Sequence, residues 1–442
     1  MTTSSFLDSI IALSETPAED LPSSMLNMAR DALFDWAAVA RAGRDEQVSI
    51  ILRNMAEREE SAGQSSLFGS TRRTAPRAAA LANGATSHAL DYDDTHFAYV
   101  GHPSVAIYPA VLALAEDMDV DIASMIDAYA IGIETACRIG ARLGRAHYNK
   151  GFHQTATAGA FGATLASARL LGLDTGQRRQ AIGLAATRAS GLKSQFGTMG
   201  KPYNAGLAAS NGVEAALLAQ AGMTSADDGL MGHQGFFATH LEADDLPADT
   251  SWEESGYLAL GLMHKYHACC HGTHAMIDAL TALRQDHGLA AADVDKVTLR
   301  TNPRWMSVCN IPAPRTGLEV KFSYVWLAAM VLENRDTAAL TSYADSTARD
   351  ADLARGADRV TVLADEAISD TAAHVTVTLD NGMSVVAEAD IAAPITEEER
   401  AERLKAKACA IDNDEVVAKI WQAVSRPADT SARAFGNTLA AR

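Results

Sequence analysis

The sequence predicts two domains, a large all-helical domain and a smaller α+β domain with an antiparallel sheet. Apolar residues recur at helical spacing from about residue 4 to about residue 260. Alanine and leucine, which favour helix, are abundant, whereas aromatic residues make up only 6%. After about residue 290, β-branched and polar residues alternate as they do in half-buried strands. A chain of 442 residues is also too long for one small core.

The segments of the predicted helical domain contain many small residues. The stretch PSSMLNMARDALFDWAAVARAG opens with Pro22-Ser23-Ser24 and ends at Gly43, which predicts a helix between these signals. Later segments such as TATAGAFGATLASARLLGL and GLAASNGVEAALLAQAGM carry alanine and glycine on most faces. No glycine-rich run follows a strand and opens a helix, so we interpret these glycines as helix-packing residues rather than as a phosphate site.

The predicted α+β domain follows from three alternating runs, KVTLRTN, RVTVLAD and HVTVTLDNGMSVVAEAD. Within the last run, Asp380-Asn381-Gly382 predicts a hairpin turn. From about residue 396 the pattern returns to helix. We therefore expect a helical domain of residues 1–265, onto which helices of residues 396–442 pack back, and an α+β domain of residues 266–395.

Charge and cysteine content narrow the class of protein. The formal net charge is −18 and no basic run occurs, which argues against nucleic acid and anionic membranes as partners. The N-terminus lacks the basic and apolar regions of a signal peptide, and no apolar run approaches the ~18 residues of a membrane span. The odd number of cysteines indicates reduced thiols and a cytoplasmic protein. These are Cys137, Cys269, Cys270, Cys309 and Cys409.

Histidines and carboxylates crowd into two stretches. The first, HALDYDDTHFAYVGHPS at residues 88–104, contains His88, Asp91, Asp93, Asp94, His96 and His102. The second, HKYHACCHGTH, contains His264, His267, His271 and His274, whose spacing on a helix would line one face. A hydrolase-type metal site is one interpretation, but no HExxH motif occurs and adjacent cysteines seldom bind one ion. We therefore expect neither a metal nor a cofactor.

The sequence also supplies the parts of a general acid/base site. Proton abstraction next to a carboxylate needs a base, a cationic or hydrogen-bonding shell for the developing charge, and an acid. The candidates for these parts are Asp91, His102, His153, Lys201, Lys265 and Tyr324. Lys201 stands between Gly200 and Pro202, so we expect it on a turn at a helix start, where anions bind well.

Two nucleophile candidates are weaker. Ser104 follows His-Pro, but no GxSxG elbow surrounds it. Cys270, near Lys265 and beside His271, is either an acid or base with a lowered pKa or a buried inert thiol.

Taken in chain order, five motifs resemble the MmgE/PrpD family. They are ANGATSHALDYDDTH with GHPS, GFH before an Ala/Gly-rich helix, FGTMGKP, KYHACCHGTH and KFSYVW. The resemblance covers essentially the whole chain and implies a helical domain, an α+β lid, a homodimer and a cofactor-free site between the domains. The family includes 2-methylcitrate dehydratase, cis-aconitate decarboxylase and iminodisuccinate epimerase, so the resemblance also implies chemistry beside a carboxylate of a small polyacid.

The resemblance carries over to individual positions. The matching residues are Asp91 and Thr95 in the D-x-D-D-T element, His102 in HPS, His153 in GFH, Lys201 in the GxxKP-like turn, Lys265 opening K-x-x-x-C-C, and Tyr324 in FSY. In cis-aconitate decarboxylase a histidine follows the matching lysine by five places. This chain has Cys270 there, which argues against decarboxylation.

We therefore expect an isomerase that epimerises the α-carbon of a small amino-polycarboxylate, with iminodisuccinate as the leading substrate. An epimerase needs a base on each side of the carbon, and Lys265 and His102 are the predicted pair. The remaining predicted catalytic residues are His153, Asp91, Tyr324 and Cys270. The predicted substrate-binding residues are Thr95, Lys201, Ser104 and His271.

Several assignments around this prediction stay open. The alternatives are a dehydratase of a 2-methylcitrate-like hydroxy-acid, a cis-aconitate-type decarboxylase, and a non-catalytic polycarboxylate-binding protein. Within the first stretch, Asp91 is expected to orient an imidazole and His88 to be structural. Asp93 and Asp94 are expected to cap or brace the turn, and His96 has no assigned role.

Overall fold

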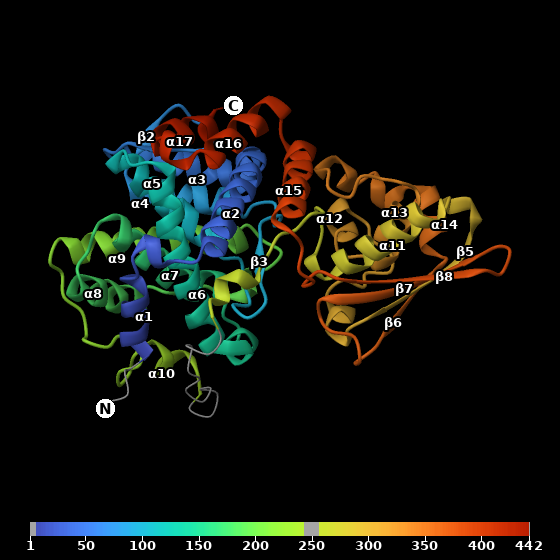
Figure 1. Cartoon of the computed structure of the whole chain (residues 1–442), viewed down its shortest axis with the longest axis horizontal. Helices are drawn as coiled ribbons and strands as arrows, with labels where there is room; N and C mark the ends of the chain where they lie inside the picture. Colours follow the sequence, from blue (N-terminus) through green and yellow to red (C-terminus); the bar gives the residue numbers. More distant parts are fainter. Residues whose placement is uncertain (1–5, 243–255, 442) are drawn as a thin grey trace. The chain divides into compact units, whose positions relative to one another are not determined.

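The computed structural model describes residues 6–242 and 256–441. The chain divides into two compact units, Met1–His264 with Asp412–Arg442, and Lys265–Ile411 (Figure 1). The first unit is helical and the second is α+β, so the fold class predicted from the sequence is confirmed.

The first unit is built almost entirely from helices. In chain order they are α1 (Phe6–Ser14), α2 (Ser23–Ala42), α3 (Gln47–Glu59), α4 (Pro76–Ser87), α5 (Ser104–Met118), α6 (Ile122–Lys150), α7 (Gln154–Leu170), α8 (Thr175–Ala186), α9 (Gly200–Gln220), α10 (Phe236–His240), α16 (Asp414–Ser425) and α17 (Ala432–Ala440). Helix α2 is flanked by Pro22 and Gly43, as its sequence signals predicted. Two pairs of short antiparallel strands connect loops of this unit. They are β1 (Ser65–Ser66) with β2 (Arg73–Thr74), and β3 (Thr95–His96) with β4 (Leu262–Met263).

Small residues set the spacing of the central helices. Helix α7 packs against α5, α6 and α9, and its residues from Gln154 to Ala168 are buried. Gly84 of α4 faces Gly206 of α9 so closely that a Cβ on Gly84 would lie 2.8 Å from the Gly206 Cα. The glycines of these helices therefore serve close packing, as the sequence indicated, because a larger side chain would push the backbones apart.

The second unit packs helices on a four-stranded sheet. Its helices are α11 (His274–His287), α12 (Gly317–Val320), α13 (Tyr324–Leu332), α14 (Ala351–Ala357) and α15 (Glu397–Ile411). Its strands are β5 (Val294–Thr301), β6 (Val360–Ala364), β7 (Ala372–Leu379) and β8 (Ser384–Asp390), in the order β6-β5-β7-β8. Helix α11 packs against β7 and β8. Every second residue of β7 is buried, which explains the alternation in its sequence.

The sheet differs from the predicted antiparallel one because it is mixed. Strands β7 and β8 form the predicted hairpin around Asp380-Asn381-Gly382, with Gly382 at φ +83°, and β5 pairs antiparallel with β7. Strand β6, however, pairs parallel with β5. Helices α12, α13 and α14 lie between β5 and β6 in the chain, and a crossover of this length is what parallel pairing requires.

The C-terminal segment is divided between the units. Helix α15 groups with the second unit, whereas the sequence analysis placed residues 396–442 with the first. Arg403 of α15 forms an ion pair with Asp278 of α11 at 3.0 Å, and its guanidinium lies 4.0 Å from the centre of the Tyr266 ring. The chain rejoins the first unit at Asp412, which accepts a 2.6 Å hydrogen bond from Arg41 of α2.

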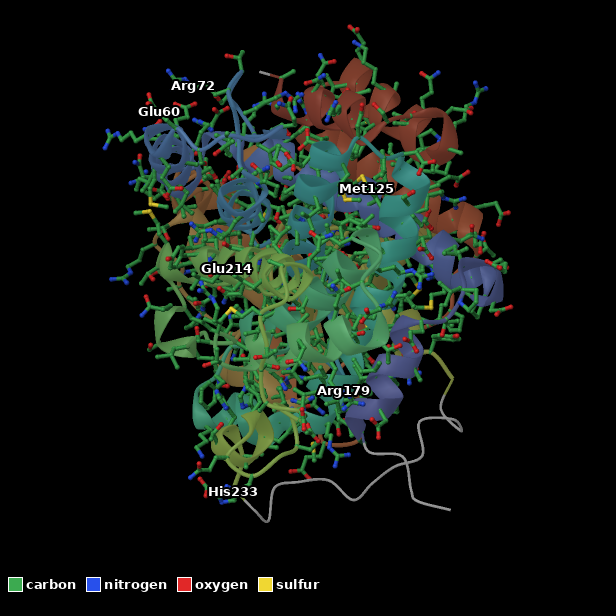
Figure 2. All side chains as sticks on the ribbon, turned by 90° about the vertical axis from the view of Figure 1, so that its left-hand side faces the viewer. Glu60, Arg72, Met125, Arg179, Glu214 and His233 are labelled. Atoms are coloured by element: carbon green, nitrogen blue, oxygen red, sulfur yellow. The ribbon has the colours of Figure 1, made fainter. Side chains whose placement is uncertain are left out.

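Charged side chains project from the surface of the first unit, while apolar ones fill its helical interior. Glu60, Arg72 and His233 project into solvent, whereas Met125 of α6 is buried (Figure 2). Among residues 6–242 and 256–441, no helix combines the length and the apolar character that crossing a bilayer requires.

Candidate active site

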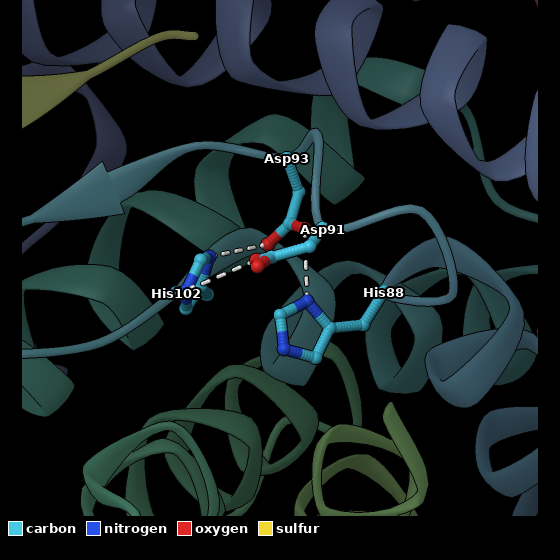
Figure 3. Close-up of side chains that lie close together, drawn as sticks. All are labelled: His88, Asp91, Asp93 and His102. Carbon is cyan, nitrogen blue, oxygen red and sulfur yellow. Dashed lines mark hydrogen bonds and ion pairs between the residues drawn. The ribbon is translucent and has the colours of Figure 1, made fainter. Parts of the chain in front are cut away.

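The loop between α4 and α5 gathers the first histidine and carboxylate stretch into one cluster. His88 follows the last residue of α4, and Asp91 adopts a left-handed conformation at φ +53°, which aspartate tolerates better than most residues. The loop returns through β3, and Pro103 leads into α5. His88, Asp91, Asp93 and His102 meet in this fold of the chain (Figure 3), and we call these four residues the loop cluster.

Asp93 lies at the centre of the loop cluster. Its Oδ1 is 2.8 Å from Nδ1 of His88, and its Oδ2 is 2.9 Å from Nδ1 of His102. Burial alone would raise the pKa of the Asp93 carboxyl, but its contacts with the imidazoles of His88 and His102 hold it well below its usual range. Asp93 is therefore ionised. The sequence analysis expected Asp91, rather than Asp93, to orient an imidazole.

Asp91 instead lies against a lysine. Its Oδ1 is 2.8 Å from Nζ of Lys201 and 3.6 Å from Nε2 of His102. The Asp91 side chain is 39% exposed, whereas those of Lys201 and His102 are 17% and 13% exposed. Lys201 lies in the first turn of α9, as predicted, so its ammonium group adds to the positive end of a 21-residue helix. An ammonium group and an imidazole thus share one partly exposed carboxylate.

Burial keeps the imidazole of His102 neutral. It lowers the pKa of His102 to about 4, although the Asp93 charge opposes this. The backbone N–H of His102 donates to Oγ1 of Thr155 on α7 at 3.0 Å, which anchors the loop to the helix core. His102 is therefore an unprotonated imidazole on a fixed backbone, which is the state that a general base requires.

His153 and two neighbours complete this side of the site. His153 precedes α7, and its Nδ1 accepts a 3.2 Å hydrogen bond from Nδ2 of Asn204. Its ring stacks on His88 at 6.2 Å and meets the edge of Phe196 at 5.0 Å. Burial first, and then the neighbouring His88, Lys201 and His102, hold the pKa of His153 well below its usual range. His153 therefore lies with the loop cluster and Lys201.

The sequence analysis expected Asp93 only to cap or brace the turn, and it did not single out Asn204 or Phe196. Asn204 follows Lys201 by three residues, so both side chains share one face of α9, and this spacing could have revealed it. Phe196 lies five residues before Lys201 and its ring centre is 5.6 Å from the ammonium nitrogen. No local signal distinguishes Asp93 from Asp94, because their roles depend on which way each side chain turns.

Asp94 and Ser104 turn to the interior instead. The Ser104 hydroxyl contacts both Asp94 and, at 2.6 Å, the hydroxyl of Tyr129, and both Ser104 and Asp94 are buried. We therefore leave Ser104 out of the substrate-binding set.

Thr95 pairs with Met263 between β3 and β4. Nε2 of His96 lies 2.7 Å from the carbonyl oxygen of Leu258, which gives His96 a structural role.

The second histidine stretch is not one helix. His264 ends the first unit, 3.1 Å from Asp35, and His267 lies in a loop between Thr337 and Asp278. His271 opens a 3-10 turn, and His274 begins α11. Only His271 and His274 therefore lie on helical turns. The four imidazoles do not share one face of a helix. The sequence pattern missed this because it shows spacing but not where a helix begins.

The remaining candidates belong to the second unit. Lys265 is only 3% exposed, and Cys270 accepts a 2.9 Å hydrogen bond from the thiol of Cys309.

The Tyr324 hydroxyl donates to the carbonyl oxygen of Gly272 at 2.7 Å. Burial also raises the pKa of this phenol above its ordinary value. Since its proton is held by the backbone, we leave Tyr324 out of the catalytic set. His271 packs its ring 4.7 Å from that of His274.

Among the residues that the structure describes, two groups have the atoms to hold a metal ion. They are the loop cluster, and a buried group made of Asp35, Asp94 and His264; in each, the candidate ligand atoms lie within 4.8 Å of one another. In the loop cluster, however, Nδ1 of His88 and Oδ1 of Asp93 form a direct 2.8 Å hydrogen bond, and Nδ1 of His102 lies 2.9 Å from the other oxygen of Asp93. We therefore describe it as a cluster of acid and base groups in direct contact with one another.

Asp94 makes the stability of the protein depend on pH. Burial raises the pKa of its carboxyl from 3.8 to about 7. The folded state thus holds a proton that the unfolded state has lost, so stability falls as pH rises from about 4 to about 7. Asp94→Asn, which stays neutral, should be more stable than wild type at about pH 8 by a few kcal/mol and closer to it at about pH 4. Urea unfolding at both pH values measures this, and an equal pH dependence in the two proteins would contradict it.

Comparison with known proteins matches two stretches of this chain to the domains of one family. Residues 12–249 match the MmgE/PrpD N-terminal domain, and residues 267–418 match the MmgE/PrpD C-terminal domain. The cis-aconitate decarboxylase-like protein oryM of Aspergillus oryzae is 30% identical over 291 residues, which is 62% of this chain and 60% of that protein. The cis-aconitate decarboxylase of Aspergillus terreus is 30% identical over 286 residues, covering 62% and 58% of the two chains.

The human cis-aconitate decarboxylase is 29% identical over 273 residues, covering 59% of this chain and 56% of that protein. The chain thus matches less than two thirds of the length of each of these relatives. The two family domains, in contrast, follow one another over most of the chain, with a break close to the boundary between the two units. The chain therefore belongs to the MmgE/PrpD family.

Proposed function

We propose that this protein is an enzyme that moves a proton at a carbon next to a carboxylate of a small polycarboxylate, with His102 as a base. The observation that carries this proposal is the neutral imidazole of His102 beside the Asp91–Lys201 ion pair. A base and a cation that lie this close can serve adjacent atoms of one substrate.

The chemistry follows from these groups. Lys201, at the positive end of α9, binds a substrate carboxylate in exchange for the partly exposed Asp91. Nε2 of His102 then removes the proton from the neighbouring carbon, and the electron pair of the C–H bond moves into the carboxylate. The negative charge of a bound polycarboxylate raises the pKa of His102, so the base becomes stronger when substrate is present.

Epimerisation is the outcome we propose first, with iminodisuccinate as substrate. It requires a second group that returns the proton to the opposite face of the carbon. We assign this role to Lys265, a buried amine that matches a functional position of the family. His153 is assigned to a second substrate carboxylate, and Thr95 and His271 stay in the proposed substrate-binding set.

A second candidate is decarboxylation, which the names of the relatives favour. In that reaction the carbon–carbon bond to a carboxylate breaks, and an acid protonates the carbon that is left. Cys270 occupies the place where the decarboxylases have a histidine. This difference is why we place epimerisation first.

One experiment separates these outcomes. The protein is incubated in deuterated water with single stereoisomers of iminodisuccinate, with cis-aconitate and with 2-methylcitrate, and proton NMR follows each mixture. We expect deuterium at the α-carbon of iminodisuccinate together with appearance of the other stereoisomers. Loss of carbon dioxide from cis-aconitate would establish the second candidate, and loss of water from 2-methylcitrate would establish a dehydratase. Binding of these compounds with neither exchange nor turnover would overturn the proposal of an enzyme.

A further inference from the structure

One buried carboxylate serves two imidazoles in the loop cluster. Asp93 is buried, and each of its oxygens faces the Nδ1 atom of a different histidine, His88 at 2.8 Å and His102 at 2.9 Å. The two rings lie 4.6 Å apart between centres, at an interplanar angle of 57°. Figure 3 shows both rings directed at this one side chain.

We propose that Asp93 is a positioning residue that holds His102, and His88 with it, in the tautomer that carries its proton on Nδ1. The Nε2 atom of His102 then carries the lone pair. The inference rests on the proposed function in one respect, namely that His102 is the base whose Nε2 atom reacts.

The argument follows from hydrogen-bonding capacity. An ionised carboxylate only accepts hydrogen bonds, whereas a neutral imidazole carries one N–H and one lone pair. On the nitrogen that lies 2.9 Å from the carboxylate oxygen, a hydrogen is therefore favoured over a lone pair, because the negative oxygen repels a lone pair at that distance. The proton of His102 is thus assigned to Nδ1, and Nε2, 3.6 Å from Asp91, is left to accept one.

The anchoring of the two histidines gives Asp93 a second effect. His88 ends α4, and the backbone of His102 is tied to Thr155 of α7. A carboxylate in contact with both rings therefore connects two helices of the first unit through the base. This arrangement fixes the orientation of the His102 ring as well as its tautomer. General base catalysis requires the reacting nitrogen to be placed to within a fraction of an ångström.

Asp93→Asn is the direct test, because it keeps the shape and removes one acceptor. An amide has one oxygen and one NH₂ group, so it cannot accept from both Nδ1 atoms. At least one histidine must then turn or move its proton to Nε2. Nitrogen-15 NMR of histidine-labelled protein distinguishes the two tautomers, and His88→Gln and His102→Gln variants assign the signals.

In wild type we expect His88 and His102 both to carry the proton on Nδ1, and in Asp93→Asn we expect at least one to change. With the substrate found above, we expect kcat to fall about 10²- to 10⁴-fold while KM changes little. Asp94→Asn is the matched control, since it alters the adjacent buried carboxylate, whose side chain contacts Ser104 rather than an imidazole. It should leave both tautomers and kcat close to wild type.

The results separate this inference from the proposed function. The wild-type spectrum needs neither a variant nor a substrate, so a His102 proton on Nε2 would overturn the role of Asp93 even if turnover is found. Unchanged tautomers and kcat in Asp93→Asn would overturn it as well. If no polycarboxylate is turned over but both protons are on Nδ1, the proposed function fails while the positioning by Asp93 stands.

Discussion

Replacing His102 with glutamine should lower kcat on the polycarboxylate substrate by about 10²- to 10⁴-fold, the range over which general acid/base groups contribute. Glutamine is similar in length and can still donate a hydrogen bond to Asp93, but it cannot accept a proton from carbon near neutral pH. Solvent deuterium exchange at the α-carbon should fall in parallel, since it reports the same proton transfer. Both quantities are measured by proton NMR in deuterated water.

The control for this prediction is His233→Gln, the same change at an exposed histidine that does not belong to the loop cluster (Figure 2). It should retain wild-type turnover and exchange. A His102→Gln protein that is folded, binds substrate and exchanges deuterium at the wild-type rate would show that another group removes the proton.

Replacing Gly206 with alanine should destabilise the first unit by about 1 to 3 kcal/mol, the usual cost of overfilling a packed interior. A Cβ at this position would lie 2.2 Å from the carbonyl oxygen of Leu81 and 3.1 Å from the backbone nitrogen of Ala85. Helices α4 and α9 would have to separate, and with them His88 at the end of α4 and Lys201 at the start of α9. Activity should therefore fall together with the midpoint of urea unfolding followed by circular dichroism.

Gly176→Ala provides the matched control. Gly176 lies in the first turn of α8, where the nearest atom to an added Cβ is a side-chain oxygen of Asp174 at 3.3 Å. The same substitution should be neutral or slightly stabilising there, because alanine favours helix over glycine by up to about 1 kcal/mol. If both variants unfold at the same urea concentration, close packing of α4 on α9 does not limit stability.

The parts of the fold that depend on local pattern could be predicted from the sequence. Proline and serine before an apolar repeat and glycine after it marked the ends of α2. The Asp-Asn-Gly turn between alternating runs marked the hairpin of β7 and β8. The parallel partner of β5 could not be predicted in this way, because strand periodicity reports which face is buried and not which strand lies alongside.

The same division applies to the candidate site. The sequence by itself determined that residues 88–104 concentrate the acids and imidazoles, that Lys201 begins a helix, and that helical segments rich in alanine and glycine follow in the chain. Only the tertiary structure decided that Asp93 rather than Asp91 holds His102, that Ser104 faces the interior, and that Lys201 meets Asp91. The physical reason is that each of these contacts depends on the direction of a side chain or on residues far apart in the chain. Local periodicity encodes neither, and both are set only when the helices pack.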